Sequence, residues 1–404
     1  MRTGYRSLLT HGHWPTLVAS FLYFDVSFMV WTMLGALGAQ IGATLRLNPA
    51  QKGLMVAVPI LGGAVLRIIL GVIADRCGAK RTGMAAQAAV IFALAVAWRC
   101  GLPSFATALA LGLALGIAGA SFAVALPQAG RWYPAGMQGL VLGLAGAGNI
   151  GVVLDALIAP AVAARQGWSA VFGWALIPTA LVLGLYALMA KDAPASTARR
   201  RVADYAALLR SGDAHWFCFL YTVSFGGFVG LASSFVLYFT AEYGLTPVHA
   251  GQWAAVCTLV GAMLRPLGGA LADRLGGTVA LRGCFGLAAA AIAAAAMVQP
   301  LAACAGAFMI ASGALGMANG AVFQLLPQRF RPELGLMTGL VGCGGGLGGF
   351  ALASVLGVSK SLSGSYAWGL VGFAGLCGVA LTAIAWNAAR WRSAWSPLGG
   401  GARI

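Results

Sequence analysis

An arginine lies inside a long apolar segment twice in this chain, at matching positions of an internal repeat. Residues 57–81 recur 198 residues later as residues 255–279, which aligns Arg67 with Arg265. An arginine near the middle of a membrane helix costs roughly 2.5–3.5 kcal/mol on insertion scales, so chains keep one only where it faces a cavity, a partner or a ligand. The pair indicates a polar site inside a membrane protein, and its charge favours an anion.

The composition supports a membrane protein, because 60% of the residues are hydrophobic and only 8% are charged. A span needs about 20 apolar residues. Twelve segments meet that length, at residues 14–38, 52–74, 82–100, 103–127, 139–163, 168–190, 215–241, 249–272, 278–298, 301–327, 334–357 and 366–390. We therefore expect an all-α polytopic membrane protein of twelve transmembrane helices.

The repeat divides these helices into two pseudo-symmetric halves of six. We expect an N-terminal half at 1–190, a polar cytoplasmic linker at 191–213 and a C-terminal half at 214–404. Two such halves related about the membrane normal resemble the plan of the major facilitator fold.

The positive charges predict the orientation. With both termini in the cytoplasm, the inner segments hold 18 of the 25 lysines and arginines, and the outer segments hold five: Arg46, Lys52, Arg99, Arg165 and Lys360. The positive-inside rule then places the chain in the cell inner membrane with both termini cytoplasmic. Membrane orientation therefore explains the net charge of +16 without a nucleic-acid partner. We expect the protein to be a monomer in the lipid bilayer.

The eight cysteines form no C-x-x-C pair and no cluster with histidine, so we expect no cofactor, no metal and no disulfide. A loop motif occurs at the end of the second span and again at the end of the eighth. It resembles the major facilitator loop signature, in which a carboxylate meets an arginine when the inner side is closed; the alternative is a solvated turn. The motif residues are Gly71, Asp75 and Arg76 in the first copy and Gly269, Asp273 and Arg274 in the second.

Spans 5 and 11 are rich in glycine, which lowers helix stability. Tight helix packing explains part of this, and bare backbone would also narrow a cavity to fit a small ligand and let the halves move. The candidate glycines are Gly146 and Gly148 in span 5 and Gly342, Gly344, Gly345 and Gly346 in span 11.

Residues 145–151, with sequence AGAGNIG, resemble the nitrate signature of the nitrate/nitrite porter family of the major facilitator superfamily. Residues 57–67, 264–269 and 24–31 resemble its motifs in spans 2, 8 and 1. The resemblance implies two arginines that clamp the anion, with aromatic rings around it. By motif, the binding residues are Arg67, Arg265, Asn149, Tyr221, Phe225, Phe28, Phe122 and Phe323. Gly345 stands in span 11 where span 5 has Asn149, so polar contacts to the ligand are expected to be asymmetric.

Guanidinium is planar and offers paired donors, which suits a planar monovalent oxyanion such as nitrate or nitrite better than tetrahedral sulfate. The alternative role of the arginines is structural ion pairing, and only Asp25 and Asp155 lie within spans as partners. The same two carboxyl groups are the candidates for carrying a proton, because charge at that depth is costly. We favour proton-coupled nitrate uptake, with nitrate/nitrite exchange as the alternative, since two empty facing arginines repel.

Three other functions compete with this interpretation. An enzyme is disfavoured because the four histidines lie at or beyond span ends and no metal or triad spacing occurs. A channel is disfavoured by the duplicated plan, which favours alternating access. A facilitator-fold porter for another small anion, or a drug exporter, is the third, and the arginine pair argues against bulky or cationic substrates.

Overall fold

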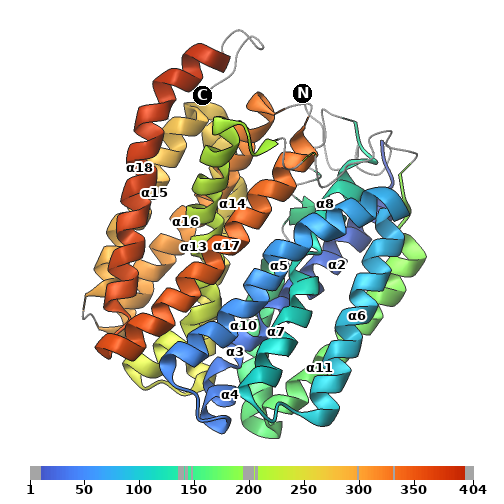
Figure 1. Ribbon diagram of the computed structural model, residues 1–404, viewed down its shortest axis with the longest axis vertical. Helices are drawn as coiled ribbons and strands as arrows, with labels where there is room; N and C mark the ends of the chain where they lie inside the picture. The colour runs from blue at the N-terminus through green and yellow to red at the C-terminus, as the bar shows by residue number, and fades with distance from the viewer. Residues whose placement is uncertain are drawn as a thin grey trace.

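The structure, a computed structural model, describes residues 11–134, 141, 144–146, 149–193, 204, 208–297, 300–330 and 333–395. Within this part of the chain, twelve helices are long and apolar enough to cross a membrane. They form one bundle of long helices (Figure 1). The expected all-α fold of twelve transmembrane helices is confirmed, and the chain is a multi-pass membrane protein. Most of the expected linker at 191–213 lies outside the described residues.

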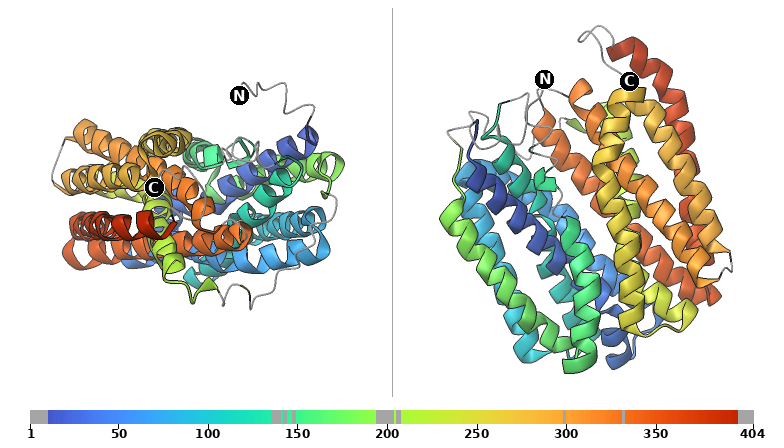
Figure 2. Two further views of the ribbon diagram at one scale, coloured as in Figure 1. Left: turned by 90° about the horizontal axis from the view of Figure 1, so that it is seen from above. Right: turned by 180° about the vertical axis from the view of Figure 1, so that it is seen from behind.

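The first group of helices comes from the N-terminal part of the chain. Its members are α2 (Trp14–Trp31), α3 (Met33–Ala36), α4 (Gly38–Thr44), α5 (Pro49–Cys77), α6 (Ala79–Cys100), α7 (Phe105–Gly119), α8 (Phe122–Gly130), α10 (Ile150–Gln166) and α11 (Trp168–Met189). The second group contains α13 (Gly212–Tyr243), α14 (Pro247–Leu275), α15 (Gly277–Ala296), α16 (Leu301–Arg329), α17 (Leu334–Ser363) and α18 (Ala367–Trp395). The two groups lie side by side in both further views (Figure 2).

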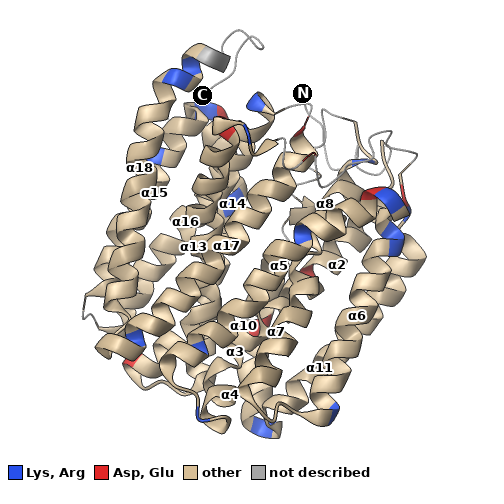
Figure 3. Ribbon diagram, viewed as in Figure 1, with Lys and Arg blue, Asp and Glu red and all other residues tan. Residues whose placement is uncertain are grey.

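The chain enters α2 and leaves α18 at the same end of the bundle, here called the termini end (Figure 1). Charged residues gather at this end and at the opposite end, and few lie between them (Figure 3). This distribution is expected for a bundle that spans a bilayer, because placing a charged side chain in the hydrocarbon core costs free energy.

The sequence marks the ends of α5 and α14 in the same way, although they lie 198 residues apart. Each helix begins with a proline at its first position, Pro49 and Pro247, after a residue whose side chain caps the first turn. Proline suits this position because its missing N–H would be unpaired there in any case. Each helix ends at a glycine with positive φ, Gly78 at 91° and Gly276 at 95°, a conformation that favours glycine.

Two spans that we expected to be continuous are interrupted. The first span breaks at Thr32, whose hydroxyl lies 3.2 Å from the carbonyl oxygen of Phe28. The fourth span breaks between α7 and α8, where the N–H of Ala123 bonds to the carbonyl of Ala120 at 3.0 Å. In a regular helix that N–H would bond to Gly119, so the break leaves the Gly119 carbonyl available to another partner.

Helices α5 and α17 join the two groups through close backbone contact. A Cβ atom on Gly53 would lie 2.7 Å from the Cα of Gly357, and one on Gly346 would lie 2.6 Å from the Cβ of Ala64. Glycine permits such approach between membrane helices. Because α5 starts at the opposite end, these contacts run from that end to the middle of the bundle.

Two further helix pairs join the groups in the same region. A Cβ atom on Gly251 of α14 would overlap the carbonyl oxygen of Ala156 in α10, and one on Gly35 of α3 would lie 2.6 Å from the carbonyl oxygen of Ser233 in α13. Gly35 lies in the last turn of the first span and Gly251 near the start of the eighth, both at the opposite end, while Ala156 lies near the middle of its span. In this conformation the two groups are therefore packed together between the middle and the opposite end.

Candidate anion-binding site

Arg67 lies in the middle of α5 and is only 1% exposed. Its Nε donates to the carbonyl of Gly119 at 3.1 Å, which is the carbonyl freed by the break in the fourth span, and its Nη1 donates to the carbonyl of Gly342 at 2.6 Å. Its Nη2 is buried and makes no hydrogen bond within the described residues. The guanidinium is thus held in place by backbone and keeps donors for a further partner.

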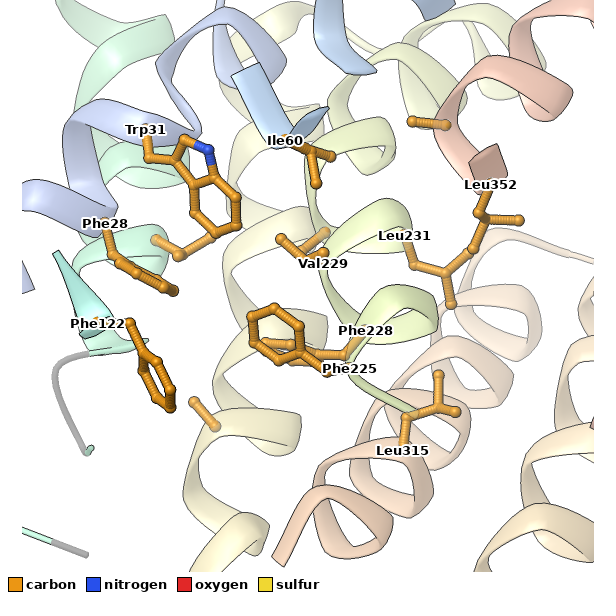
Figure 4. Close-up of a cluster of buried hydrophobic side chains, with 14 of the residues drawn as sticks. Phe28, Trp31, Ile60, Phe122, Phe225, Phe228, Val229, Leu231, Leu315 and Leu352 are labelled. Atoms are coloured by element: carbon orange, nitrogen blue, oxygen red, sulfur yellow. The ribbon is translucent and has the colours of Figure 1, made fainter. Parts of the chain in front are cut away.

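Three aromatic rings from three helices surround the Arg67 guanidinium. Its central carbon lies 5.3 Å from the ring centroid of Trp31 in α2, 5.4 Å from that of Phe122 in α8 and 5.2 Å from that of Phe225 in α13. Figure 4 shows Trp31 and Phe122 on one side of this space and Phe225 across from them. Rings within about 6 Å attract the cation through their π faces and exclude water from it.

Arg265 occupies the corresponding position in α14 and is half-buried. Its Nη2 lies 3.5 Å from the hydroxyl oxygen of Tyr221, and its guanidinium carbon lies 5.7 Å from the ring centroid of Phe323. Its Nη1 is buried without a hydrogen-bond partner among the described residues. Arg265 is held less firmly than Arg67, and it also retains unused donors.

The stacked rings of Tyr221 and Phe225 connect the two arginines. Their centroids are 5.1 Å apart with an interplanar angle of 3°. Arg265 bonds to Tyr221, and Arg67 lies over Phe225, so each guanidinium touches one member of the pair. Phe323 meets Tyr221 edge-on at 5.3 Å and lies 6.5 Å from Phe122 of the first group. The structure therefore brings both arginines and these four aromatic residues together.

Neither arginine forms an ion pair within the described residues. Asp25 accepts a hydrogen bond from the backbone N–H of Gly151 at 2.7 Å, and Asp155 bonds to the hydroxyl of Thr32 at 3.0 Å. Structural ion pairing by these two carboxyl groups is therefore absent from the described part of the chain.

Among the described residues, neither Phe28 nor Asn149 forms a hydrogen bond or a cation–π contact with Arg67 or Arg265. Phe28 packs against Phe24 and Trp31, at centroid distances of 4.2 and 4.7 Å, and Trp31 in turn lies beside Arg67. Asn149 is the residue before the first turn of α10, but its buried side chain does not cap the helix, and its Oδ1 has no hydrogen-bond partner among the described residues. An unpaired buried amide oxygen is costly.

The glycines of span 11 pack against the aromatic pair and the neighbouring helices. A Cβ on Gly345 would lie 2.7 Å from the ring of Tyr221 and 2.8 Å from that of Phe225. A Cβ on Gly344 would lie 3.2 Å from the carbonyl oxygen of Cys218. Gly345, which stands in span 11 where span 5 has Asn149, thus leaves room for the stacked rings.

The glycines of span 5 have a different environment. A Cβ on Gly146 would meet no atom within 4 Å, so packing in this conformation does not require a glycine there. Gly148 lies outside the described residues.

The first loop motif forms an ion pair within the first group. Asp75, near the end of α5, bonds to Arg131 just after α8, with an Nη2–Oδ1 distance of 2.5 Å. Gly71 is buried one turn earlier, and Arg76 is exposed. The pair ties the second span to the fourth at the termini end.

The second loop motif is arranged differently. Asp273 and Arg274 are exposed at the end of α14, and a Cβ on Gly269 would lie 3.7 Å from the carbonyl oxygen of Gly320. Arg329, which the repeat aligns with Arg131, forms an ion pair of 2.6 Å with Asp213 at the start of α13.

Trp31 was not among the expected site residues, although it contacts Arg67 directly. Its spacing carried a usable signal, because Phe24, Phe28 and Trp31 are four and three residues apart and share one helix face. The carbonyl groups of Gly119 and Gly342 were also missed, and backbone acceptors leave no such signal in a sequence.

Comparison with known proteins places the chain in a family. The model of the Major Facilitator Superfamily matches residues 17–353. A protein of Mycobacterium tuberculosis (strain H37Rv) named "Probable nitrate/nitrite transporter NarK2" is 33% identical over 342 residues, covering 83% of this chain and 86% of the relative. The "Nitrite extrusion protein" of Bacillus subtilis (strain 168) is 31% identical over 359 residues, covering 88% of each chain.

The fold also matches a solved structure. A bacterial homologue of the human lysosomal transporter Spinster, in an inward-facing and occupied conformation, superposes with a TM-score of 0.71 at 20% identity, covering 96% of this chain and 97% of the other. Family model, relatives and architecture agree with the resemblance found in the sequence. The chain belongs to the nitrate/nitrite porter family of the Major Facilitator Superfamily.

Proposed function

We propose that this protein transports nitrate, and also nitrite, across the cell inner membrane by alternating access, with Arg67 and Arg265 clamping the anion between them. One observation carries the proposal: two arginines from the two helix groups flank the same stacked ring pair, and each retains a buried nitrogen with no hydrogen-bond partner among the described residues. A bound anion would satisfy both nitrogens and relieve the repulsion between the two cations.

The geometry favours a flat, monovalent anion. Guanidinium presents two parallel N–H donors that match two coplanar oxygens. The rings of Phe122, Phe225, Tyr221 and Phe323 bound the same region with flat apolar surfaces, which a tetrahedral dianion would have to displace. Nitrite shares the charge and the plane of nitrate, so we expect modest discrimination between them.

Transport would require the contacts between α5 and α17 and between α10 and α14 to open. With both termini in the cytoplasm, these contacts close the outer side in the present conformation. An anion that enters against a negative-inside potential costs roughly 2.3 kcal/mol per 100 mV. We favour coupling to protons, and nitrate/nitrite exchange is the second candidate.

Binding and flux measurements test this function. Purified protein should bind nitrate and nitrite in competition with each other and far more tightly than chloride or sulfate. Arg67→Lys and Arg265→Lys keep the charge but lose the planar pair of donors, and each should weaken binding about 10- to 100-fold, as expected for one or two lost charge-assisted hydrogen bonds.

Arg282→Lys is the matched control, because Arg282 lies in α15 and, among the described residues, bonds only to the carbonyl of Thr278 within its own helix, at 3.4 Å. It should retain nitrate uptake in proteoliposomes. Near-normal uptake in both site variants would rule out the clamp, and strong binding of sulfate or a carboxylate in place of nitrate would assign the site to another anion.

A further inference from the structure

Asp155 is the most deeply buried carboxyl group within the described spans, at 3% exposure. It lies in α10, and its Oδ2 is 3.0 Å from the hydroxyl oxygen of Thr32. Its Oδ1 is also buried and has no hydrogen-bond partner among the described residues. An ionised carboxylate without a cation costs several kcal/mol to bury, so this environment suits the neutral acid.

The hydroxyl of Thr32, which bonds to this carboxyl group, has other acceptors within reach as well. A threonine hydroxyl has one hydrogen to donate. Three oxygens surround it: the carbonyl oxygens of Phe28 at 3.2 Å and Met29 at 3.5 Å, and Oδ2 of Asp155 at 3.0 Å. When the hydroxyl hydrogen points to the Phe28 carbonyl, the contact with Asp155 is a hydrogen bond only if the carboxyl group supplies the proton.

No charged group contacts Asp155 from the elements packed around it. Helices α2, α3, α11 and α14 pack on α10, and α3 contains no ionisable side chain. The ionisable groups on the others are Tyr23 and Asp25 on α2, Arg165 on α10 itself, Tyr186 on α11, and His249, Cys257, Arg265, Asp273 and Arg274 on α14. Among the described residues, Asp155 bonds to Thr32 alone.

Asp25 differs from Asp155 in this respect. It accepts the backbone N–H of Gly151 in the first turn of α10, where the helix dipole favours negative charge. An ionised Asp25 is therefore stabilised as the cap of α10, and it is only half-buried. Asp25 meets α10 four residues before Asp155, roughly 6 Å away along the helix axis.

The bond between Asp155 and Thr32 lies beside contacts that must open during transport. Ala156, the next residue in α10, packs against Gly251 of α14. On the other side, Thr32 precedes α3, which packs on α13, and follows Trp31, whose ring lies over Arg67. Parting of α10 from α14 would remove the packing on Ala156, the residue next to Asp155, and closing them restores it.

We propose that Asp155 takes up a proton when the helix groups close at the end opposite the termini, and that its protonated carboxyl group donates to Thr32 in the closed form. This inference rests on the proposed transport function and identifies Asp155 as the residue that carries the coupled proton. Without the proton, Thr32 would donate to the carboxylate, and the Phe28 carbonyl would keep only the backbone N–H of Thr32 at 3.3 Å. The proton would thereby let the hydroxyl bond to both neighbours at the break next to Trp31.

Infrared spectroscopy of the purified protein tests the protonation independently of transport. Wild type should show the carbonyl band of a protonated carboxyl group, and the band should remain in Asp25→Asn and disappear in Asp155→Asn. Asparagine is nearly isosteric, and its amide can still donate to Thr32. A missing band in wild type, or a band that persists in Asp155→Asn, would overturn the proposal.

Proteoliposomes test the coupling. Asp155→Asn should retain nitrate/nitrite exchange but lose at least tenfold in nitrate accumulation driven by an imposed pH gradient, whereas Asp25→Asn should retain both. The reverse pattern would assign coupling to Asp25. If wild type exchanged nitrate for nitrite but never accumulated nitrate with a pH gradient, the coupling role of Asp155 would be refuted while the transport function stood. If wild type moved no nitrate at all, the proposed function would fail, and the infrared band would still decide whether Asp155 is protonated.

Discussion

Arg67 donates a 2.6 Å hydrogen bond from Nη1 to the carbonyl of Gly342, and the two residues belong to different helix groups. The candidate ligand-binding arginine is therefore itself part of the contact between α5 and α17. When the groups separate, Arg67 must release this carbonyl, so the donors available to an anion differ between the two conformations.

Tyr221→Phe tests the link between Arg265 and the ring pair. The variant removes the hydroxyl that lies 3.5 Å from Arg265 and keeps the stacking on Phe225. A hydrogen bond of ordinary net strength corresponds to roughly a two- to tenfold loss of nitrate affinity. Titration calorimetry measures the loss, with Tyr238→Phe in the same helix as control. Unchanged affinity would show that the hydroxyl does not position Arg265.

Gly345→Ala tests the space behind the ring pair. The added Cβ would lie 2.7 Å from the ring of Tyr221 and 2.8 Å from that of Phe225. Overpacking of this kind costs about 1–3 kcal/mol of free energy and would displace the two rings. We therefore expect nitrate affinity to fall about tenfold while the protein still inserts into the membrane. Gly306→Ala is the control, because a Cβ there meets nothing within 4 Å. Equal transport by the two variants would contradict this role of Gly345.

Trp31→Phe tests the residue that sequence reasoning missed. The indole Nε1 donates to the carbonyl of Pro59 at 2.7 Å, and phenylalanine would leave that buried carbonyl without its donor, at a cost of about 1–3 kcal/mol. We expect a lower melting temperature and weaker nitrate binding. Trp368→Phe, at a position that is 73% exposed, should change neither. Loss of stability without loss of binding would limit Trp31 to a structural role.

Asp213→Asn tests the ion-pair cluster at the termini end. The carboxylate accepts hydrogen bonds from Arg329 at 2.6 Å, from Arg390 at 3.2 Å and from the indole of Trp391 at 3.1 Å. It thereby joins α13, α16 and α18. Both arginines are partly exposed. We therefore expect the free energy of unfolding to fall by about 1–3 kcal/mol, which is less than the cost of breaking a fully buried ion pair.

Thermal unfolding in detergent measures this loss. Glu242→Gln, which affects a smaller cluster at the opposite end with Lys360, provides the comparison. An equal or larger decrease in melting temperature for Glu242→Gln would contradict the role of Asp213.

The spans and the arginine pair could be predicted because they depend on properties that are local in the sequence. Length and polarity decide whether a segment crosses a membrane, and the repeat alone aligned Arg67 with Arg265. The breaks at Thr32 and between α7 and α8 could not be predicted, because apolar stretches continue through both positions.

The environments of the two carboxyl groups depend on helix rotation and packing, which a sequence does not encode locally. In the sequence, Asp25 and Asp155 are both candidates for carrying a proton because both lie within spans. The structure shows Asp25 at the first turn of α10, where a backbone N–H stabilises its charge, while Asp155 is enclosed with a hydroxyl. The roles of both groups, and of the arginine clamp, stay predictions.

The protein holds the two arginine side chains unequally, so the binding site contains one guanidinium group that is fixed and one that is adjustable. In this conformation two backbone carbonyls and three rings hold Arg67, whereas Arg265 has one long hydrogen bond and one ring. Immobilising a free arginine side chain costs up to about 2 kcal/mol of conformational entropy, and only Arg265 would bear that cost at each binding event. Affinity could then be tuned over evolution by residues that restrict the rotamers of Arg265 without ever touching the anion.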